Sequence, residues 1–531
     1  MPRVTINDVE LDVPAGTNVI EAARLAGVDI PHYCYHPHLS IAGNCRMCMC
    51  ETDTPRGPVL EIACNMTARE GLVVRTETEK VKAVRKSVME FLLVNHPLDC
   101  PICDQSGECR LQDYYMDHGA YDSRGVENKV SKHKRQDIGE HIVLDAERCV
   151  QCSRCVRFGD EVTGTGELRL MNRGDHTEIG MFPGEKLTHN YQGNLADICP
   201  VGALTSKDFR FQRRVWYLKE SDSVCTGCAT GCNITVCHQE GSVFRYLPRR
   251  NDAVNKSWMC DPGRARHADA AGMQRVLHST IDGQKATLDA ALTEIARRIR
   301  GVGGAKVGVV FGAQATNEAN WALANVVKAN LPGARVFCVA GNDAGSIAAS
   351  DDLLLDADKN PNTLGVALIA QHVGGVGGNE ALVAAAPDLS LLVVLEDDIV
   401  SRLAGAVLPP LVVLSSWRSS TATNATILVA VAHSVEQDGS YTNKSGRVQR
   451  VRRAVNPMGD ATPAYQVLDK LGAKLGAAPG TSMPAATFMA MARAIPRMKG
   501  MDFKGLGSGG MQLAPIPAAV PVVASPAAEA K

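Results

Sequence analysis

Cysteine is confined almost entirely to the first half of this 531-residue chain. Seventeen of the eighteen cysteines precede residue 261, and only Cys338 follows it. The first residues show no basic segment followed by an apolar one, so we expect no secretory signal peptide. Without export the thiols stay reduced, which favours metal binding over disulfide bonds.

Fifteen of these cysteines and one histidine form four groups with short spacings, and each group has the pattern of an iron–sulfur ligand set. The first set is Cys34, Cys45, Cys48 and Cys64, and the second is His96, Cys100, Cys103 and Cys109. The third set is Cys149, Cys152, Cys155 and Cys199, and the fourth is Cys225, Cys228, Cys232 and Cys260. Several clusters on one chain indicate an electron relay, because a protein with a single redox centre would need only one cluster.

The first set indicates a [2Fe–2S] cluster. Cys45 and Cys48 have the plant-type spacing, although ten residues separate Cys34 from Cys45 in place of four. Gly43 and Asn44 permit a tight turn that presents backbone N–H groups to the sulfurs. A zinc knuckle is the alternative for this set alone.

The other three sets indicate [4Fe–4S] clusters. In the second, neutral His96 supplies the fourth ligand, and Gly107 allows the turn before Cys109. The third combines the bacterial ferredoxin triplet with Cys199, which is followed by Pro200. The fourth has a 27-residue gap before Cys260.

Two further groups of residues lie outside the ligand sets: arginines that allow two interpretations, and cysteines that are not expected to bind a cluster. Arginines beside the ligands either stabilise reduced clusters electrostatically or are ordinary solvated side chains. Cys50, Cys237 and Cys338 are off pattern and are predicted to be structural. The arginines are Arg46, Arg110, Arg148, Arg154 and Arg157.

The hydrophobic pattern predicts two kinds of architecture. A hairpin over residues 4–13 and a helix over 17–26 precede the first cysteine loop, an order typical of a small ferredoxin-like sheet domain. A second helix over 79–94 is predicted to bury Val81, Val84, Val88, Phe91 and Leu92. Residues 115–148 are polar and read as a connector.

Beyond residue 280 the pattern alternates between strands and helices, which predicts an α/β domain with a mainly parallel sheet. Strands are expected at 306–311, 335–340, 391–395 and 411–414, and a helix at 317–329. From Gln512 onward alanine, proline and valine dominate, which is typical of a disordered tail.

Other functions find little support in the sequence. The net charge of −1 gives no sign of nucleic-acid binding, and no apolar run approaches a membrane span. Residues 505–510 match a bare GxGxxG pattern but follow no strand, so we interpret them as a flexible linker. No serine–histidine–aspartate or paired-carboxylate arrangement stands out.

Several motifs resemble the large iron–sulfur subunit, also called the G subunit, of NADH:quinone oxidoreductase, respiratory complex I. Residues 33–37 (YCYHP), 43–48 (GNCRMC) and 96–103 (HPLDCPIC) carry the resemblance. So do residues 172–180 (NRGDHTEIG) and 199–207 (CPVGALTSK). The dense match extends over about residues 1–265. Residues 438–443 with 446–449 resemble part of the molybdopterin-oxidoreductase fold.

The resemblance implies one [2Fe–2S] and two [4Fe–4S] clusters, and it supports a third [4Fe–4S] cluster in the fourth set, off the main path. Electrons would pass from a flavin-bearing, NADH-oxidising subunit toward quinone-side iron–sulfur subunits. The chain itself would have no NADH, flavin or molybdenum site. It would lie at the cytoplasmic side of the cell membrane and reach the membrane only through partner subunits.

The implied fold is a series of α+β ferredoxin-like cluster domains followed by a truncated molybdopterin-oxidoreductase-like α/β domain. The expected domains are 1–78 for the [2Fe–2S] site, 79–118 for the His/Cys₃ site and 119–217 for the third set. They continue with 218–274 for the fourth set, 275–500 for the α/β domain and 501–531 for a disordered tail.

Three alternatives remain at this point. A wiring subunit of an NAD-linked hydrogenase or formate dehydrogenase shares the first three sets. A molybdenum oxidoreductase in its own right is favoured by the fourth set and the sheet domain. A zinc scaffold fits the His96 set and the Cys149 triplet poorly.

Overall fold

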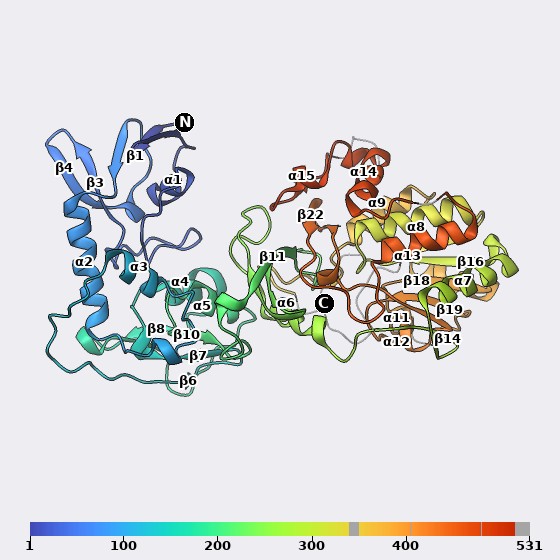
Figure 1. Ribbon diagram of the computed structural model, residues 1–531, viewed down its shortest axis with the longest axis horizontal. Helices are drawn as coiled ribbons and strands as arrows, with labels where there is room; N and C mark the ends of the chain where they lie inside the picture. The colour runs from blue at the N-terminus through green and yellow to red at the C-terminus, as the bar shows by residue number, and fades with distance from the viewer. Residues whose placement is uncertain (339–349, 404, 479, 516–531) are drawn as a thin grey trace, which may run out of the picture. The chain divides into compact units, whose positions relative to one another are not determined.

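The computed structural model describes residues 1–338, 350–403, 405–478 and 480–515. These residues divide into two units (Figure 1). The first unit comprises Met1–Leu218 and the short segment Trp258–Asp261. The second comprises Lys219–Ser257 and the chain from Pro262 onward. The segment Trp258–Asp261 therefore belongs with the first unit although it follows part of the second in sequence.

The first unit begins with a five-stranded sheet in the order β2-β1-β5-β3-β4, drawn in blue in Figure 1. Strands β1 and β5 are parallel and the other neighbours are antiparallel. Val4 and Ile6 of β1 point inward and pack with helix α1, because alternate strand residues face the core. The elements are β1 (Arg3–Ile6), β2 (Val9–Asp12), α1 (Val19–Leu25), β3 (Met49–Thr54), β4 (Gly57–Ile62) and β5 (Leu72–Arg75).

Helix α2 spans Glu79–Val94, the bounds that the sequence predicts. Its buried face differs from the predicted one, because Phe91 is 81% exposed. Arg85 lies inside instead, where its guanidinium donates to the carbonyl of Met49 at 3.3 Å. The buried guanidinium thus has a backbone acceptor, whereas the ring of Phe91 faces solvent. The fully buried helix residues are Val81, Arg85 and Met89.

The remainder of the first unit is built from short elements that leave long ligand-bearing loops. Residues 136–148, predicted to be part of a polar connector, contain β6, β7 and a 3₁₀ turn, and β7 pairs with β10 downstream of the third set. That long-range pairing is not visible in local composition. The elements are α3 (Arg110–His118), β6 (Gln136–Asp137), β7 (Ile142–Leu144), α4 (Arg154–Phe158), β8 (Arg169–Met171), β9 (Glu178–Gly180), α5 (Gly193–Ile198) and β10 (Leu204–Ser206).

The second unit contains a seven-stranded sheet in the order β15-β14-β20-β19-β18-β16-β17. The five strands from β17 to β20 are mutually parallel, and β14 and β15 add antiparallel pairs at one edge. This confirms the mainly parallel sheet. The strands are β14 (Ser279–Ile281), β15 (Gln284–Ala286), β16 (Val307–Phe311), β17 (Arg335–Cys338), β18 (Leu391–Leu395), β19 (Leu411–Ser415) and β20 (Ile427–Ala430). Residues 339 and 340, predicted to continue β17, lie outside the described residues.

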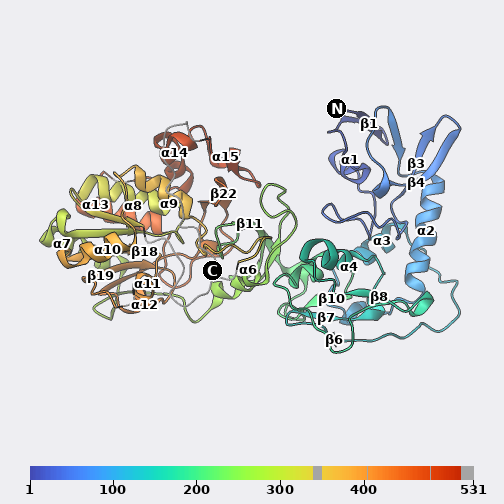
Figure 2. The ribbon, with the colours of Figure 1, turned by 180° about the vertical axis from the view of Figure 1, so that it is seen from behind.

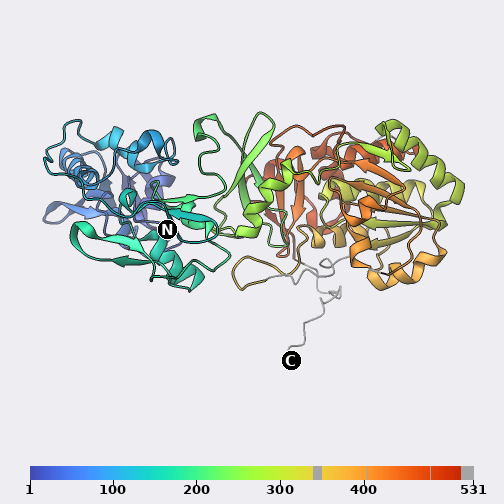
Figure 3. The same ribbon diagram turned by 90° about the horizontal axis from the view of Figure 1, so that it is seen from below.

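Helices cover both faces of this sheet, and Figures 2 and 3 show them on its two sides. Val309 and Val393 pack on one side with α7, α8, α9, α13 and α14, whereas Val310 and Val394 pack on the other with α10, α11 and α12. Strands buried on both faces need continuous apolar runs, which explains sequences such as that of β18. The helices are α7 (Leu288–Val302), α8 (Asn317–Asn330), α9 (Thr363–Gln371), α10 (Asn379–Ala385), α11 (Ile399–Arg402), α12 (Ser420–Thr423), α13 (Ala464–Leu475) and α14 (Pro484–Ala494).

Two smaller sheets complete the second unit. One is antiparallel, in the order β11-β12-β13, and it precedes the short helix α6. The other joins β21, β22 and β23. The elements are β11 (Lys219–Val224), β12 (Asn233–Gln239), β13 (Ser242–Pro248), α6 (Asp261–Ala265), β21 (Gly439–Thr442), β22 (Arg447–Val451), α15 (Phe503–Leu506) and β23 (Met511–Gln512).

The predicted tail over 501–531 is folded in its described part. Helix α15 and strand β23 lie within it, and β23 pairs with β22 through Val448 and Met511. The glycine run interpreted as a linker is also held, because Asn251 and Arg447 donate to the carbonyl of Gly509 at 3.0 and 3.1 Å. Residues 516–531 of the predicted tail lie outside the described residues.

Within the described ranges, no helix has both the length and the apolar character needed to cross a bilayer.

Candidate metal centres

The first set gathers four thiols in the loop region beside the N-terminal sheet. The thiols of Cys45 and Cys64 hydrogen-bond to that of Cys34, and the thiols of Cys48 and Cys64 hydrogen-bond to each other. Hydrogen bonds from the Cys45 and Cys64 thiols, together with the backbone N–H groups of Cys45 and Asn44, lower the pKa of Cys34. The same hydrogen bonds raise the pKa of Cys45 and that of Cys64, so a thiolate, the form that binds metal, is favoured at Cys34 while its neighbours keep their protons. The four side chains predicted for the first set are therefore brought together.

The turn that carries Cys45 has the backbone that the sequence predicts. Gly43 has a φ of +61°, in the left-handed region where glycine has no steric penalty. The N–H of the next residue, Asn44, faces the Cys34 sulfur. Donors aimed at a ligand sulfur stabilise its negative charge and tune a bound cluster.

The second set encloses a cavity of about 330 Å³. His96, Cys100, Cys103 and Cys109 all contribute to its wall. Cys109 stands at the start of α3, and Gly107 before it has a φ of +94°, in line with the predicted turn.

His96 is the unusual member of the second set, and its environment suits a ligand. Burial lowers the pKa of His96 to about 4, which keeps the imidazole neutral. Its Nδ1 is buried without a hydrogen-bond partner. A buried, unpaired ring nitrogen is costly unless something coordinates it. The donor set therefore fits an iron cluster held by three thiolates and one imidazole.

The third set lines a smaller cavity of about 20 Å³. Cys149, Cys152, Cys155 and Cys199 all reach it. The chain winds tightly through the triplet because Gln151 and Ser153, the latter just before α4, adopt left-handed φ values of +53° and +58°. The N–H of Gln151 donates to the Cys149 sulfur at 3.3 Å.

Burial sets the protonation of the third set. It raises the pKa of Cys149 and that of Cys199 to about 12 in each case. These thiols therefore hold their protons in the absence of metal and release them when a cation replaces them. The chemistry of the four donors fits a cubane cluster.

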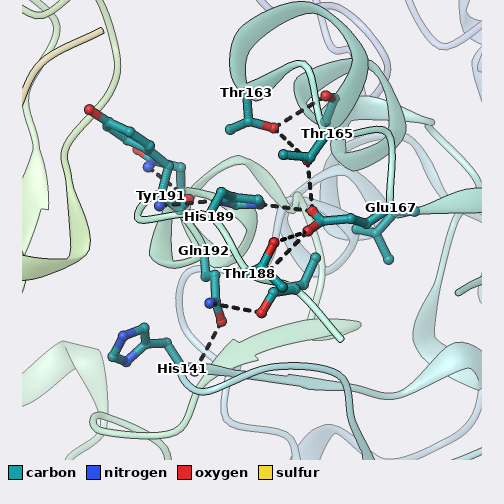
Figure 4. A network of polar contacts seen from close by, with 12 residues as sticks. His141, Thr163, Thr165, Glu167, Thr188, His189, Tyr191 and Gln192 are labelled. Carbon is teal, nitrogen blue, oxygen red and sulfur yellow. Dashed lines mark hydrogen bonds and ion pairs between the residues drawn. The ribbon is translucent and has the colours of Figure 1, made fainter. Parts of the chain in front are cut away.

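A polar network centred on Glu167 holds the segment that leads to the third set's last cysteine (Figure 4). Its carboxylate accepts the hydroxyl of Thr165 at 2.7 Å and the N–H and hydroxyl of Thr188 at 3.0 and 2.9 Å. Burial acts to raise the pKa of Glu167, but these hydrogen bonds outweigh it and hold the pKa below its usual range. His189 Nδ1 accepts the N–H of Tyr191 at 3.1 Å, and Nε2 lies 3.5 Å from the Glu167 carboxylate. The loop before α5 is thereby fixed.

Asp261 caps the helix that delivers Cys199. Its carboxylate accepts the N–H groups of Gln192 and Gly193, at the start of α5, at 2.7 and 2.8 Å. Asn194 exchanges two further hydrogen bonds with the backbone of Met259, at 2.7 and 3.0 Å. Negative charge at a helix N-terminus satisfies N–H groups that have no partner within the helix. The segment Trp258–Asp261 is thus built into the third-set scaffold.

Three of the four members of the fourth set belong to the second unit. Cys225, Cys228 and Cys232 are buried in the second unit, where the Cys225 N–H donates to the Cys232 carbonyl at 2.8 Å. The N–H of Gly227 donates to the Cys225 sulfur at 3.4 Å. Cys260 belongs to the first unit. Sequence spacing gives no warning of this division, since it depends on the tertiary contacts of the residues around Cys260.

Two of the cysteines outside the sets are fully buried, and Cys338 at the end of β17 is half-buried. Cys50 is fully buried in β3, and Cys237 is fully buried in β12. Over the described ranges, no three or more His, Cys, Asp or Glu side chains form a site for a metal ion as they stand.

Sequence reasoning missed several residues that shape these sites. Gly202 is the clearest, because a Cβ there would lie 2.3 Å from the sulfur of Cys103. Its only sequence signal was its position three residues after Cys199. Asp261, next to Cys260, had a similar signal. Arg154 and Arg157 were noticed for their charge, yet both donate hydrogen bonds to backbone carbonyls of the ligand loops.

Sequence models of four iron–sulfur families match successive parts of the chain. They are described as a 2Fe–2S iron–sulfur cluster binding domain (residues 2–79), an NADH-ubiquinone oxidoreductase-G iron–sulfur binding region (85–124), an NADH-quinone oxidoreductase subunit 3 ferredoxin-like domain (139–205) and an NADH-ubiquinone oxidoreductase NDSU1/NuoG-like 4Fe–4S domain (218–268). A fifth, molybdopterin oxidoreductase, matches residues 396–474.

Curated relatives point the same way. The NADH-quinone oxidoreductase G subunit of Rickettsia bellii is 41% identical over 327 residues, which are 61% of this chain and 47% of that protein. The mitochondrial NADH dehydrogenase (ubiquinone) iron–sulfur protein 1 of Solanum tuberosum is 43% identical over 281 residues, or 53% and 38% of the two chains. Over part of its length, this chain is therefore similar to NADH-quinone oxidoreductase G subunits.

The chain spans about half the length of the curated relatives it matches. It carries a [2Fe–2S] domain and several [4Fe–4S] domains, followed by a molybdopterin-oxidoreductase-like α/β domain. Among solved structures, an NAD⁺-reducing [NiFe]-hydrogenase in the H₂-reduced state matches with 28% identity and a TM-score of 0.36. That match covers 40% of this chain and 91% of the hydrogenase chain.

Proposed function

We propose that this chain is an iron–sulfur electron-transfer subunit of the peripheral arm of an NADH:quinone oxidoreductase. Electrons enter from a flavin-bearing, NADH-oxidising subunit and leave toward quinone-side iron–sulfur subunits. The observation that carries the proposal is that, within one unit, the members of the second set line one cavity, those of the third line another, and the thiols of the first lie close together. The homology to the G subunit supplies the context.

The residues of each set have distinct roles in this proposal. Cys34, Cys45, Cys48 and Cys64 hold the [2Fe–2S] cluster, His96 with Cys100, Cys103 and Cys109 holds one [4Fe–4S] cluster, and Cys149, Cys152, Cys155 and Cys199 hold a second. Bound clusters accept and release single electrons. The protein buries many of the ligands and aims N–H donors at the sulfurs of Cys34 and Cys149, which tunes the potentials of those sites.

The fourth set, Cys225, Cys228, Cys232 and Cys260, is proposed to hold a further [4Fe–4S] cluster away from the main path. The chain has no NADH, flavin or molybdenum site of its own in this proposal. We place it at the cytoplasmic side of the cell membrane, attached through partner subunits.

Replacing Cys152 with alanine tests the proposal within the assembled complex. We expect one [4Fe–4S] signal to disappear from the EPR spectrum, the signals of the other sites to remain, and electron transfer from NADH to quinone to stop. The matched control is Cys50→Ala, which removes a buried thiol outside the sets and should leave every signal intact. Normal quinone reduction in the Cys152 variant would overturn the relay.

A further inference from the structure

Helix α4 presents two arginines, Arg154 and Arg157, to the loop that carries Cys34. They are three positions apart, so their side chains share one face of the helix. The helix starts inside the third set, because Cys155 is its second residue. Both arginines donate hydrogen bonds to backbone carbonyls in place of pairing with carboxylates.

Arg157 joins a ligand of the first set to a ligand of the third. Its Nη2 donates to the carbonyl of Cys34 at 2.6 Å and to the carbonyl of Cys152 at 3.2 Å. Its Nη1 donates to the carbonyl of Ser40, and its Nε donates to the hydroxyl of Ser153 at 3.3 Å. One guanidinium therefore spans two ligand loops that lie far apart in sequence.

Neighbouring contacts hold the same two loops together. Arg154 donates to the carbonyl of Tyr35 and to that of Ile198, the latter at 3.1 Å, and Ile198 precedes a third-set ligand. The side-chain amide of Asn44 donates to the carbonyl of Gln151 at 3.1 Å. The bonds to Tyr35 and from Asn44 join the first-set loop to the third-set loop, and the bond to Ile198 ties α4 to the segment before Cys199. The alignment of the two sites is thus specified several times.

Aromatic side chains pack the same junction. Trp258 is 2% exposed and stacks on His36, with ring centroids 4.9 Å apart and planes inclined by 19°. Phe158, the last residue of α4, meets the same indole edge-on at 5.0 Å. Buried rings exclude water and lower the local dielectric, which strengthens the nearby hydrogen bonds.

We propose that Arg157 is a positioning residue for electron transfer between the first and third sites. Its guanidinium fixes the carbonyls of Cys34 and Cys152 relative to each other and completes a hydrogen-bonded path between the two ligand loops. One electron leaves one site, which is oxidised, and enters the other, which is reduced.

This inference rests on the proposed function and goes beyond a general effect of charge. A positive charge near two anionic sites raises both potentials whatever its shape. The contacts observed here instead need a planar fork, because the donors reach acceptors on Cys34, Ser40, Cys152 and Ser153. The compact ammonium of lysine keeps the charge but cannot reproduce that geometry.

The test compares Arg157→Lys and Arg157→Gln in the full chain with its clusters assembled. An electron is delivered photochemically, and its equilibration between the first and third sites is followed through their separate optical and EPR signals. Hydrogen exchange of residues 34–44 reports how firmly the first loop is held. The control is Arg56→Lys, an exposed arginine elsewhere in the first unit.

We expect Arg157→Lys to keep both EPR signals and both reduction potentials while equilibration slows by about tenfold or more. The exchange of residues 34–44 should accelerate by a similar factor, since losing one charge-assisted hydrogen bond shifts a local equilibrium by about tenfold. Arg157→Gln should slow equilibration as well and should also lower both potentials.

Three results would overturn the positioning role. If the electron equilibrates at the wild-type rate in Arg157→Lys, Arg157 contributes only its positive charge. Loss of either EPR signal in both variants would make it a residue needed for assembly. If hydrogen exchange of residues 34–44 accelerates while electron equilibration between the two sites is unchanged, Arg157 holds the loop without affecting electron transfer. A wild-type chain without either EPR signal would instead refute the proposed function itself.

Discussion

Replacing Asp261 with alanine should release the helix that delivers Cys199. The Asp261 side chain is 5% exposed, and its carboxylate is bonded to the N–H groups of Gln192 and Gly193 at the start of α5. Alanine leaves both donors buried without these acceptors. Helix α5 has six residues and cannot sustain itself without such support.

The magnitude follows from the two lost hydrogen bonds. A buried donor left without a partner costs about 1–3 kcal/mol, so the free energy for opening α5 should fall by about 2–6 kcal/mol. Asp261→Asn retains one amide oxygen as an acceptor but loses the negative charge, so its loss should be about half as large.

Hydrogen exchange of residues 190–199 in the full chain measures this opening directly, and the EPR signal of the third site reports its consequence. The control is Asp252→Ala, an exposed aspartate paired with Arg250 at the surface, which should change stability by less than about 0.5 kcal/mol. A change below about 0.5 kcal/mol in Asp261→Ala, with the third-site signal intact, would refute the reasoning.

Two further predictions concern a close backbone approach and a buried carboxylate. Gly202→Ala should abolish or distort the second-site EPR signal, because its Cβ would lie 2.3 Å from the Cys103 sulfur. The control is Gly301→Ala, where a Cβ meets nothing within 4 Å. An unchanged second-site signal in Gly202→Ala would contradict the placement of Gly202. Burial raises the pKa of Glu318 from 4.5 to about 7, so the stability gained from its bound proton is complete below about pH 4.5 and is lost as the pH rises through 7. Between pH 5 and pH 8 the free energy of unfolding of the wild type should therefore fall by about 2.5 kcal/mol more than that of Glu318→Gln, which mimics the protonated form. Equal falls in the two proteins would count against the buried carboxyl.

Local signals in the sequence predicted much of the fold. The bounds of helix α2 and strand β18 follow from runs of suitable residues, and both agree with the structure. The ligand sets were also visible, because cluster chemistry demands cysteines at short spacings. In the structure the second and third sets each line a cavity and the thiols of the first set contact one another, while their role as cluster ligands stays a prediction.

Long-range contacts account for what the sequence could not predict. The glycines at 505–510 have the composition of a linker, but the pairing of β23 with β22 and the bonds to Gly509 hold them in place. Phe91 lies on the apolar stripe of α2, yet Arg85 takes the buried side because Met49 offers it a carbonyl. The placement of Cys260 with the first unit depends on Asp261 and Asn194, which bond to partners more than sixty residues away.

Metal analysis of the anaerobically purified full chain tests the central claim most directly. Four filled sites predict about 14 irons per chain, with neither molybdenum nor tungsten, and about 10 would mean that one cubane site, expected to be the fourth, is empty. Zinc in place of iron, or stoichiometric molybdenum or tungsten, would contradict the account of this chain as an iron–sulfur electron carrier.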